Sequence, residues 1–416
     1  MTPTRPPLLP LDEATERLLS HARPLTETES VSTFDADGRV LAQDVVSQLQ
    51  VPPQDNSSMD GYAVRCADLQ QQPGAPLIVS QRIPAGASGQ ALQPGHAARI
   101  FTGAPIPAGA DAVVMQEDCE LVPAPEADAF ASVKIAGTVA PGQWIRRSGE
   151  DVTRGSVVLA QGARLSPAGL GMAASVGMDR LQVVRRPRVA LFSTGDELVM
   201  PGAVAPADMR EGAIYNSNRF FLRAMLLRLG CEVSDLGIVP DQRAATVQAL
   251  REASQRHDLI LTSGGVSVGE EDHIRPAVES LGDLDLWQIA VKPGKPFAYG
   301  HVADAHFIGL PGNPVSSFVT FALLVRPFVL RLLGVPDVAP VVVTARADFA
   351  WPRADRRREF LRVRRNAQGG LDLFANQSSG VLTSAVWGDG LVDNPPGQSI
   401  AKGDSVRFIA LSDLLS

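Results

Sequence analysis

The chain has few cysteines, and they form no metal-binding or disulfide pattern. Only Cys66, Cys119 and Cys231 occur among 416 residues, and no pair has the spacing Cys-x-x-Cys. The six histidines make no metal-spaced pair on a common predicted helix. Neither a disulfide-stapled fold nor a thiolate zinc site is therefore supported.

Positive net charge, a targeting segment and a long apolar run are also missing. Residues 1–10 are proline-rich and lack a basic start followed by an apolar stretch. The most apolar segment, residues 315–333, is interrupted by Arg326-Pro327 and Arg331, so it falls short of the ~20 apolar residues of a membrane span. A formal charge of −7 argues against broad nucleic-acid binding. We expect a cytoplasmic enzyme with no membrane or nucleic-acid partner.

Length and composition predict a globular chain of several domains. A chain of 416 residues exceeds one ordinary core, and its 45% hydrophobic and 20% charged fractions are typical of globular proteins. Shifts in pattern along the chain predict an N-terminal region at 1–186, an α/β domain at 187–335 and a C-terminal β domain at 336–416. The N-terminal region is expected to contain an inserted small β domain at about 55–145, where short β-branched runs are broken by Gly and Pro.

Apolar strand-like runs alternate with helical runs between residues 187 and 335. Strands are expected at 189–192, 231–239, 259–261, 287–291 and 306–310. Helices are expected after Ser217 or Asn218 as the cap, at 243–256, and from Val315 onward. Continuous apolar strands separated by helices indicate a doubly wound, mostly parallel sheet. The fold class predicted for the chain is multidomain α/β.

The loops after these strands hold most of the unusual chemistry. Five of them should converge at the carboxyl edge of the sheet, where such folds bind ligands. They carry carboxylates such as Asp241 and Glu270, the cations Lys292 and Lys295, and many glycines. Bare amides and lysines suit an oxyanion, and carboxylates beside them suit Mg²⁺. In any single loop the glycines and prolines could simply form a turn. Both a Walker loop and a dinucleotide fingerprint are absent from the sequence.

Several motifs, in order along nearly the whole chain, resemble the MoeA family. They are LFSTGDEL at 191–198, SGGVSVG at 263–269, KPGKPF at 292–297, GLPGNPV at 309–315, DNSSMDGYA at 55–63 and FTGAP at 101–105. Members of this family are molybdopterin molybdenumtransferases, and the catalytic half of gephyrin is related to them. The resemblance implies insertion of molybdenum from molybdate into adenylylated molybdopterin, with release of AMP, assisted by Mg²⁺.

The resemblance also implies a set of functional residues. The expected catalytic residues are Asp60, Thr102, Glu197, Asp241, Lys292 and Lys295. The expected substrate-binding residues are Arg146, Asp151, Ser263, Gly264, Gly265, Asp272, Pro311, Pro314, Arg362 and Ser379. Glu197, Asp241 and Asp272 are the expected metal ligands. By this interpretation, the glycine amides and the two lysines hold the pyrophosphate, and Pro311 and Pro314 stiffen their loop.

Two positions depart from the family pattern. Gln288 replaces a common lysine, so either Lys292 acts more strongly or another basic residue compensates. Ser148 stands where an arginine is common, beside the predicted site residues Arg146 and Asp151.

Two stretches have a plainer structural interpretation. Residues 52–61 could be only a connecting loop of Asx-type turns. The arginines at 353–365 crowd one predicted hairpin, whose turn is Gln368-Gly369-Gly370, and such runs usually form a solvated face. The functional alternative is that Arg362 leans into the cleft to hold molybdate, with Ser378 or Ser379 nearby. Tungstate remains an alternative oxyanion.

Further elements complete the predicted architecture. A helix is expected at 11–22, a strand at 40–51, and a helix from Ser166-Pro167 to Gly177. C-terminal strands are expected at 341–345, 359–363, 371–374 and 405–411, as in a small barrel or sandwich. The apolar residues 315–333 suggest burial on both sides, by the sheet and by a second subunit.

We expect a homodimer whose sites are shared between subunits. Asp60 and Thr102 lie more than one predicted domain away from the sheet. Other expected partners are an adenylyltransferase of the same pathway and recipient molybdoenzymes. The alternative functions are molybdopterin adenylyltransferase, a related nucleotide pyrophosphatase, and a non-catalytic scaffold.

Overall fold

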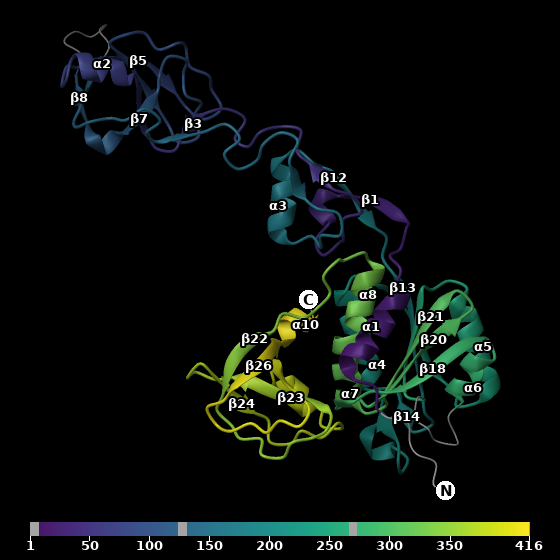
Figure 1. Cartoon of the computed structure of the whole chain (residues 1–416). Coiled ribbons are helices and arrows are strands. Elements are labelled where there is room, and N and C mark those ends of the chain that lie inside the picture. Colours follow the sequence, from purple (N-terminus) through teal and green to yellow (C-terminus); the bar gives the residue numbers. More distant parts are fainter. Residues whose placement is uncertain (1–7, 124–130, 266–272, 416) are drawn as a thin grey trace.

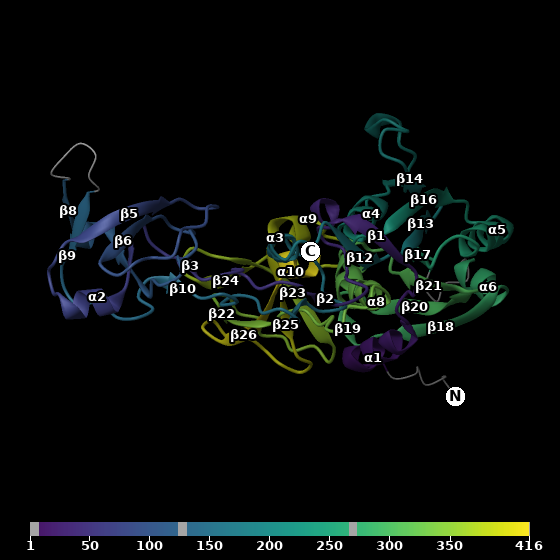
Figure 2. The ribbon, with the colours of Figure 1, turned by 90° about the horizontal axis from the view of Figure 1, so that it is seen from above.

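The computed structural model describes residues 8–123, 131–265 and 273–415. The chain forms an elongated molecule of four modules (Figure 1). A distal module lies at one end, a middle module follows, and a central module lies beside a C-terminal module at the other end, as the view from above also shows (Figure 2).

The distal module is a small β structure. Its six-stranded sheet has the order β7-β4-β6-β5-β9-β8. These strands are β4 (Gly61–Val64), β5 (Leu77–Ile83), β6 (His96–Ile100), β7 (Ala112–Met115), β8 (Cys119–Val122) and β9 (Ser132–Ile135). A two-stranded ribbon joins β3 (Asn56–Ser57) to β10 (Ile145–Arg146), and the helices are α2 (Cys66–Gln71) and the 3₁₀ turn η2 (Gln116–Asp118). The predicted β-rich character of this segment is confirmed.

The middle module is built from chain segments on both sides of the distal one. It contains β1 (Thr28–Ser32), the 3₁₀ turn η1 (Thr33–Asp35), β2 (Val45–Val46), β11 (Val157–Leu159), α3 (Pro167–Ser175) and β12 (Arg180–Val184). Ser166 caps α3 as predicted, because its side chain accepts a hydrogen bond from the Gly169 amide. The predicted strand at 40–51 is wrong in extent: only short pairings occur there, at Val40, Leu41, β2 and Val51, because each segment bonds a different partner.

The central module holds a six-stranded sheet of order β16-β13-β17-β21-β20-β18. The strands are β13 (Arg188–Thr194), β16 (Glu232–Val239), β17 (Leu259–Ser263), β18 (Gly282–Gln288), β20 (Pro296–Val302) and β21 (Ala305–Leu310). The first four in spatial order are parallel, as predicted, whereas β20 and β18 are antiparallel. The predicted strand at 287–291 is therefore divided: Trp287 and Gln288 end the edge strand β18, which pairs antiparallel with β20, and Val291 begins a separate short strand.

Helices cover both faces of the central sheet. One face packs on α5 (Arg243–Ser254) and α6 (Ile274–Glu279), through residues such as Leu250 and Ile274 against Phe192. The other packs on α1 (Leu11–His21), α4 (Asn218–Arg228) and one continuous run of helix, made of α7 (Pro314–Thr320), the π-helical η4 (Phe321–Val325) and α8 (Arg326–Leu332). Phe192 and Leu191, neighbours on β13, point into the two separate cores, which explains why the strand is apolar throughout.

The apolar helical run is buried by its own chain. Pro314–Leu332 is long and apolar enough to cross a membrane, but 78% of its most apolar window is buried inside the protein. It packs between the sheet, α1 and α4, with C-terminal residues such as Phe360 in the same core. The prediction that a second subunit covers this helix is therefore wrong, because α1 and α4 already cover it.

The C-terminal module is a closed barrel of five strands with one added strand. Its sheet order is β19-β23-β24-β22-β26-β25, and β25 pairs back to β23. The strands are β22 (Val343–Ala347), β23 (Arg358–Arg365), β24 (Gly370–Leu373), β25 (Gly390–Asn394) and β26 (Ser405–Ala410), with helices α9 (Thr383–Trp387) and α10 (Leu411–Leu415). The added strand, β19 (Val291–Lys292), comes from the central module and pairs with β23. Backbone hydrogen bonds therefore join the two modules.

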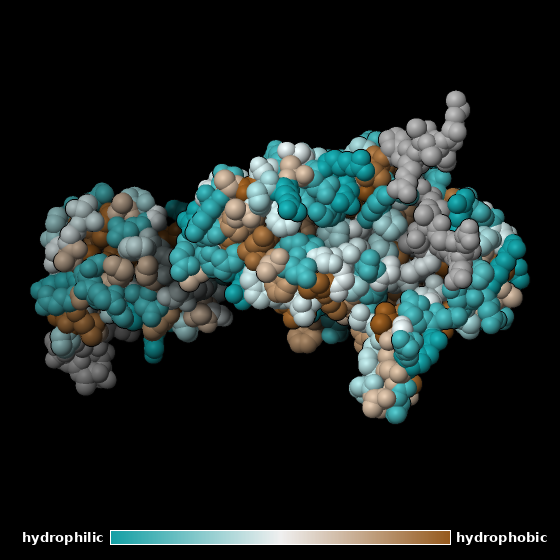
Figure 3. All heavy atoms as spheres, turned by 90° about the horizontal axis from the view of Figure 1, so that it is seen from below, coloured by the Kyte–Doolittle hydropathy of each residue, from teal (hydrophilic) through white to brown (hydrophobic). Residues whose placement is uncertain are grey.

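A lobe projects from the central module beside the carboxyl edge of its sheet (Figure 2). It contains β14 (Leu198–Val199), the 3₁₀ turn η3 (Pro206–Asp208) and β15 (Ile214–Tyr215). On the face seen in Figure 3, hydrophilic and hydrophobic residues are interspersed from the distal module to this lobe.

Candidate functional site

Loops at the carboxyl edge of the central sheet line a cavity of about 790 Å³, here called the cleft. Seven of the predicted site residues line it: Glu197, Asp241, Ser263, Gly264, Gly265, Pro311 and Pro314. They come from the loops after four parallel strands, β13, β16, β17 and β21. Gly380 of the C-terminal module also reaches the cleft. The sheet thus brings these side chains together, although they are up to 117 positions apart in the chain.

Gly264 and Gly265 allow the loop after β17 to pass close to the end of β13. Both have positive φ, +94° and +66°. A Cβ on Gly265 would lie 2.4 Å from Ile274 Cγ1, so no side chain fits there. The Gly264 amide donates to Leu310 O at 3.0 Å and is therefore not available to a ligand. The Gly265 amide has no hydrogen-bond acceptor within the part of the chain that the structure describes.

Two carboxylates share the cleft. Glu197 folds back over Gly195, so closely that a Cβ on that glycine would lie 2.5 Å from Glu197 Oε2. Asp241 follows Pro240 at the end of β16 and lines the same space. Mg²⁺ characteristically uses one or two carboxylates together with ligand phosphates, and this pair suits that coordination. Among the described residues, no three His, Cys, Asp or Glu side chains are grouped closely enough to hold a metal alone.

One predicted metal ligand, Asp272, lies outside the described residues, as do Glu270 and the second half of the motif at 263–269. Its role therefore stays a prediction.

Asn218 ties two of the cleft loops together. Its Nδ2 donates to Ser263 Oγ at 2.8 Å and to Gly312 O at 2.7 Å. Ser217, one of the two expected caps, is the N-cap residue of α4, but its side chain makes no capping hydrogen bond. Asn216 Oδ1 accepts from the Arg219 amide instead. The sequence signal for Asn218 is the pattern Asn-x-Asn in front of an apolar helix. Such a pattern indicates a helix cap more readily than a hydrogen bond between two loops.

Asn216 is a cleft residue that sequence reasoning missed. It lines the cleft and is 2% exposed. Its Oδ1 is occupied by the Arg219 amide, whereas its Nδ2 is buried without a partner in the described chain. An unpaired buried amide nitrogen is costly, so this group is a candidate donor to a bound ligand.

Lys292 faces the C-terminal module. Its Nζ lies 3.0 Å from Glu359 Oε1 and 3.3 Å from Asp355 Oδ2. The Glu359 side chain is 1% exposed, and its other oxygen accepts from Trp351 Nε1 at 2.8 Å. The pKa of Asp355 is lowered, chiefly by its hydrogen bond from Arg357, and also by Lys292. Lys292 is thus held by carboxylates at the junction of the two modules and does not line the cleft.

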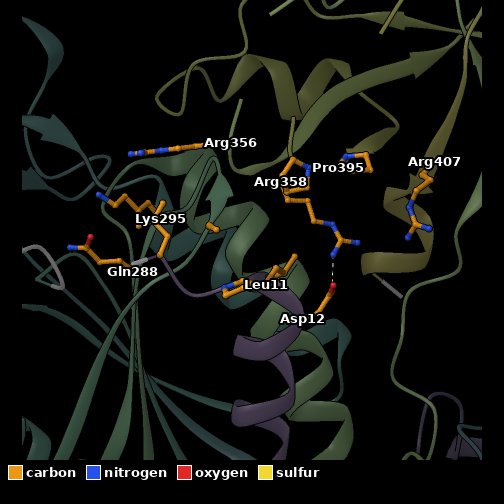
Figure 4. A pocket seen from close by; sticks show the side chains of 12 residues that line it. Leu11, Asp12, Gln288, Lys295, Arg356, Arg358, Pro395 and Arg407 are labelled. Atoms are coloured by element: carbon orange, nitrogen blue, oxygen red, sulfur yellow. Dashed lines mark hydrogen bonds and ion pairs between the residues drawn. The ribbon is translucent and has the colours of Figure 1, made fainter. Parts of the chain in front are cut away.

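Lys295 and Gln288 line a second cavity, of about 820 Å³, between the start of α1, the segment 288–295 and the C-terminal module (Figure 4). Pro296, the next residue, lines the cleft. The segment carrying Lys295 therefore separates the two cavities.

Arg362 lies inside the C-terminal module and not in the open cleft. It is 2% exposed, and its guanidinium donates to Ser384 Oγ at 3.1 Å and to Phe360 O at 3.0 Å. Burial lowers its pKa to about 10. A longer contact of 3.4 Å reaches Ser378 O, in the loop that leads to the cleft. The neighbouring Ser379 O accepts from the Val315 amide at the start of α7.

Asp60 and Thr102 lie together in the distal module. Asp60 Oδ1 accepts from both the amide and the hydroxyl of Thr102, at 2.8 Å each. The Thr102 amide is the main cause of the lowered pKa of Asp60, which is therefore a carboxylate at neutral pH. The distal module, which carries this pair, lies at the end of the molecule away from the central sheet (Figure 1).

Arg146 and Asp151 are exposed on the segment that leaves the distal module. Arg146 pairs with Asn56 in the β3–β10 ribbon, which continues into the Asp60 loop. Ser148 anchors this loop: its amide donates to Asp55 Oδ1 at 2.8 Å, and Arg147 forms an ion pair with the same carboxylate. The residue that departs from the family pattern thus has a local structural role.

Comparison with family models covers most of the chain. Residues 9–177 match the MoeA N-terminal region, domains I and II; residues 190–331 match a probable molybdopterin binding domain; and residues 344–411 match the MoeA C-terminal region, domain IV.

Curated relatives and solved structures agree with these models. The chain is 42% identical to the molybdopterin molybdenumtransferase of Haemophilus influenzae, over 88% of this chain and 89% of the relative. It is 37% identical to molybdopterin molybdenumtransferase 2 of Mycobacterium tuberculosis, over 91% and 92%. The crystal structure of the molybdopterin biosynthesis moeA protein from Pyrococcus horikoshii OT3 superposes with a TM-score of 0.84 at 29% identity, covering 97% of this chain and 100% of that one.

Proposed function

The chain belongs to the MoeA family of molybdopterin molybdenumtransferases, and we propose that it transfers molybdenum from molybdate into adenylylated molybdopterin and releases AMP. The observation that supports this most directly is the cleft, which gathers seven predicted site residues from four strand ends. The adenylyltransferase alternative is not favoured, because the match extends over the N-terminal and C-terminal regions as well as the molybdopterin binding domain.

We propose that the cleft binds the pyrophosphate of the substrate. The free Gly265 amide and the start of α7 supply positive potential from backbone dipoles. The Nδ2 of Asn216 is available to donate a further hydrogen bond. When the phosphoanhydride breaks, water adds to phosphorus and negative charge develops on the leaving phosphate oxygen. Donors held in fixed positions by the protein stabilise that charge better than mobile water does.

Mg²⁺ is the proposed cofactor, with Glu197 and Asp241 as its protein ligands and Asp272 as a third candidate. When bound, the ion would polarise phosphate oxygens and neutralise their charge. The side chain of Glu197 packs over Gly195, and this contact orients its carboxylate for the role.

Lys292, Lys295, Arg362 and Ser379 are the proposed oxyanion residues. Lys295 and Ser379 each directly precede a residue that reaches the cleft, Pro296 and Gly380 respectively. Arg362 supports the Ser378–Ser379 loop from beneath. Lys292 would act through the field of its ammonium group or after release from Glu359.

Asp60, Thr102, Arg146 and Asp151 are proposed to complete the site of a second copy of the chain. The distal module carries them far from the cleft of its own chain (Figure 1). A two-fold symmetric homodimer would place the Asp60–Thr102 pair of one chain over the cleft of the other, twice. We also propose a cytoplasmic location, and as pathway partners an adenylyltransferase and recipient molybdoenzymes.

The test of the proposed function is direct. Purified protein is incubated with adenylylated molybdopterin, Mg²⁺ and molybdate, and AMP release and cofactor formation are followed together. We expect both products in equal amounts. AMP release without cofactor formation would indicate a nucleotide pyrophosphatase, and absence of both would favour a binding or scaffold protein.

A further inference from the structure

Arg99 of β6 contacts the chain segments that hold the Asp60–Thr102 pair in the distal module. Its Nη1 donates a hydrogen bond to Gly61 O at 2.8 Å, and Gly61 directly follows Asp60. Its Nη2 donates to Gln116 Oε1, and the Gln116 amide in turn donates to Asp60 O at 3.1 Å. One guanidinium thus fixes the backbone next to Asp60 both directly and through Gln116.

The same guanidinium lies over two aromatic rings. Its Cζ is 4.6 Å from the centroid of the Phe101 ring and 5.3 Å from that of the Tyr62 ring. Both distances are within the ~6 Å over which a cation and a ring face attract each other. Phe101 directly precedes Thr102, and Tyr62 lies two residues after Asp60. Arg99 therefore links the segment that carries the carboxylate to the loop that carries the hydroxyl.

The charge of Arg99 is not neutralised by an ion pair. Strand β6 lies between β4 and β5, and Arg99 is paired in register with Arg82 of β5. Two cations at paired positions of neighbouring strands repel each other. Within the described residues, neither arginine forms an ion pair with a carboxylate. The pKa of Asp60 is lowered first by the Thr102 amide and hydroxyl, and further by the charge of Arg99.

We propose that Arg99 is a positioning residue for the reaction: by holding the two segments together, it fixes the Asp60 carboxylate and the Thr102 hydroxyl in the geometry that they present to substrate. This inference rests on the proposed function, in which the pair completes the cleft of a second copy of the chain. Both side chains are exposed, and exposed loops open locally at low free energy unless other contacts hold them. The hydrogen bonds of Arg99 go to its own module, so it acts through this pair and not on substrate directly.

Hydrogen exchange of the Thr102 amide tests this support without an enzyme assay. The amide donates to Asp60 Oδ1 at 2.8 Å, so its exchange rate reports how firmly the two segments are held. In the full chain, Arg99→Gln is expected to speed this exchange about tenfold, because local opening becomes more frequent. The rate is measured by mass spectrometry with fragmentation to single residues. Unchanged exchange in this variant would overturn the proposal.

Two further variants make the exchange measurement specific. Arg99→Lys should exchange as fast as Arg99→Gln, since an ammonium lacks the planar fork that lies over two rings and donates to two acceptors. Arg82→Gln is the matched control, because the Arg82 guanidinium lies over the same Phe101 ring, at 4.8 Å, but makes no hydrogen bond to either segment within the described chain. It should leave Thr102 exchange and cofactor formation within about twofold of wild type. Wild-type exchange in Arg99→Lys, or an equal effect of Arg82→Gln, would contradict the specific role of the Arg99 guanidinium.

A double-mutant cycle connects this support to the reaction. Arg99→Gln should lower cofactor formation about tenfold, which is less than the ~10²-fold that a 1 Å misplacement of a reacting group costs. In the Asp60→Asn background the same substitution should cost less than about twofold, because the carboxylate that it positions is already gone. Equal losses in both backgrounds would show that Arg99 acts only on the stability of the module, and the positioning role would be wrong.

Failure of the proposed function gives a different result. A fully active Asp60→Asn variant would remove Asp60 from the proposed function, whereas the exchange rates would still decide whether Arg99 holds the Asp60 and Thr102 segments together. Circular dichroism of each variant is the control for folding.

Discussion

Lys292 shows how a predicted catalytic side chain can also hold modules together. Its ammonium pairs with Glu359, which is almost completely buried and is also bonded by Trp351 and Asn394. A buried carboxylate needs such partners, because leaving it unpaired costs far more than the pair gains. The lysine therefore contributes to stability at the junction whether or not it contacts substrate.

Replacing Lys292 by Met should lower the free energy of unfolding by about 1–3 kcal/mol, because the buried Glu359 loses its cationic partner. Adding Glu359→Gln should recover part of that loss, since the amide oxygen still accepts from Trp351 and carries no charge. Urea denaturation of the two single variants and the double variant measures the coupling. Purely additive losses would contradict the pairing.

Replacing Asp241 by Ala should reduce AMP release by ~10²-fold or more, the scale of losing one electrostatic contact in a transition state. The fold should remain, because the residue lies in a loop at the cleft wall. The assay is single-turnover AMP release at saturating Mg²⁺, with circular dichroism as the control for folding. Unchanged release would remove Asp241 from the proposed chemistry.

Which residues gather at the cleft could be predicted from the sequence, but the direction of individual side chains could not. The rule that loops meet at the carboxyl edge of a parallel sheet placed Glu197, Asp241 and Ser263 correctly. Lys292 follows the antiparallel strand β18, and its ammonium pairs with Glu359, which lies 67 positions later in the chain. No local sequence pattern indicates that pairing. Arg362 was expected to lean from a cationic hairpin into the cleft. On β23 it lies on the face opposite Leu361 and Val363, which are in the barrel core, and contacts with Ser384 and the Ser378 loop bury it.

The hydrophobic pattern of the sequence predicted strands and helices correctly where one or both faces of the element are buried. The strands β13 and β17 were predicted because they are apolar throughout, and α3 because of its Ser-Pro start. Short elements stabilised by distant partners were not predicted. β19 has two residues and exists only because β23 pairs with it, and the helix at 314–332 needed no second subunit because α1 covers it.

The contact between α1 and the β20–β21 hairpin contains a cluster of histidines. Tyr299 hydroxyl bonds both His306 Nδ1 at 2.9 Å and His301 Nε2 at 3.1 Å, and His21 of α1 packs on the Tyr299 ring. Burial, and then the neighbouring His301 and His21, lower the pKa of His306 from 6.5 to about 4. Asp283, which bonds His301, is the nearby carboxylate on the exposed side.

The protein should lose stability as the pH falls from 6.5 toward 4. In this window the unfolded chain binds a proton at His306 and the folded chain does not. The free energy of unfolding therefore decreases as the pH decreases, by at most on the order of 3 kcal/mol. His306→Asn keeps a polar atom near the Tyr299 hydroxyl and removes the titration. Urea denaturation across this range should give a shallower pH dependence for the variant. Identical slopes would show that other groups carry the effect.

The elongated arrangement of the modules explains why one chain does not bring all predicted site residues together. The cleft gathers residues from the central module, whereas Asp60 and Thr102 sit in the distal module at the other end (Figure 1). The sequence predicted each group from its motif, but relative placement depends on the middle module. Its strands come from both sides of the distal insertion, and no sequence period sets that geometry.

The measurement that tests the account most directly is complementation between two inactive variants. Asp60→Ala and Asp241→Ala are purified separately, shown to be inactive in AMP release and cofactor formation, and mixed under conditions that exchange subunits. If each site combines the cleft of one chain with the Asp60 loop of its partner, every mixed dimer has one intact site, and activity should return to about a quarter of wild type after random pairing. No recovery after verified exchange would show that each chain supplies its own Asp60, and the shared-site account would be contradicted.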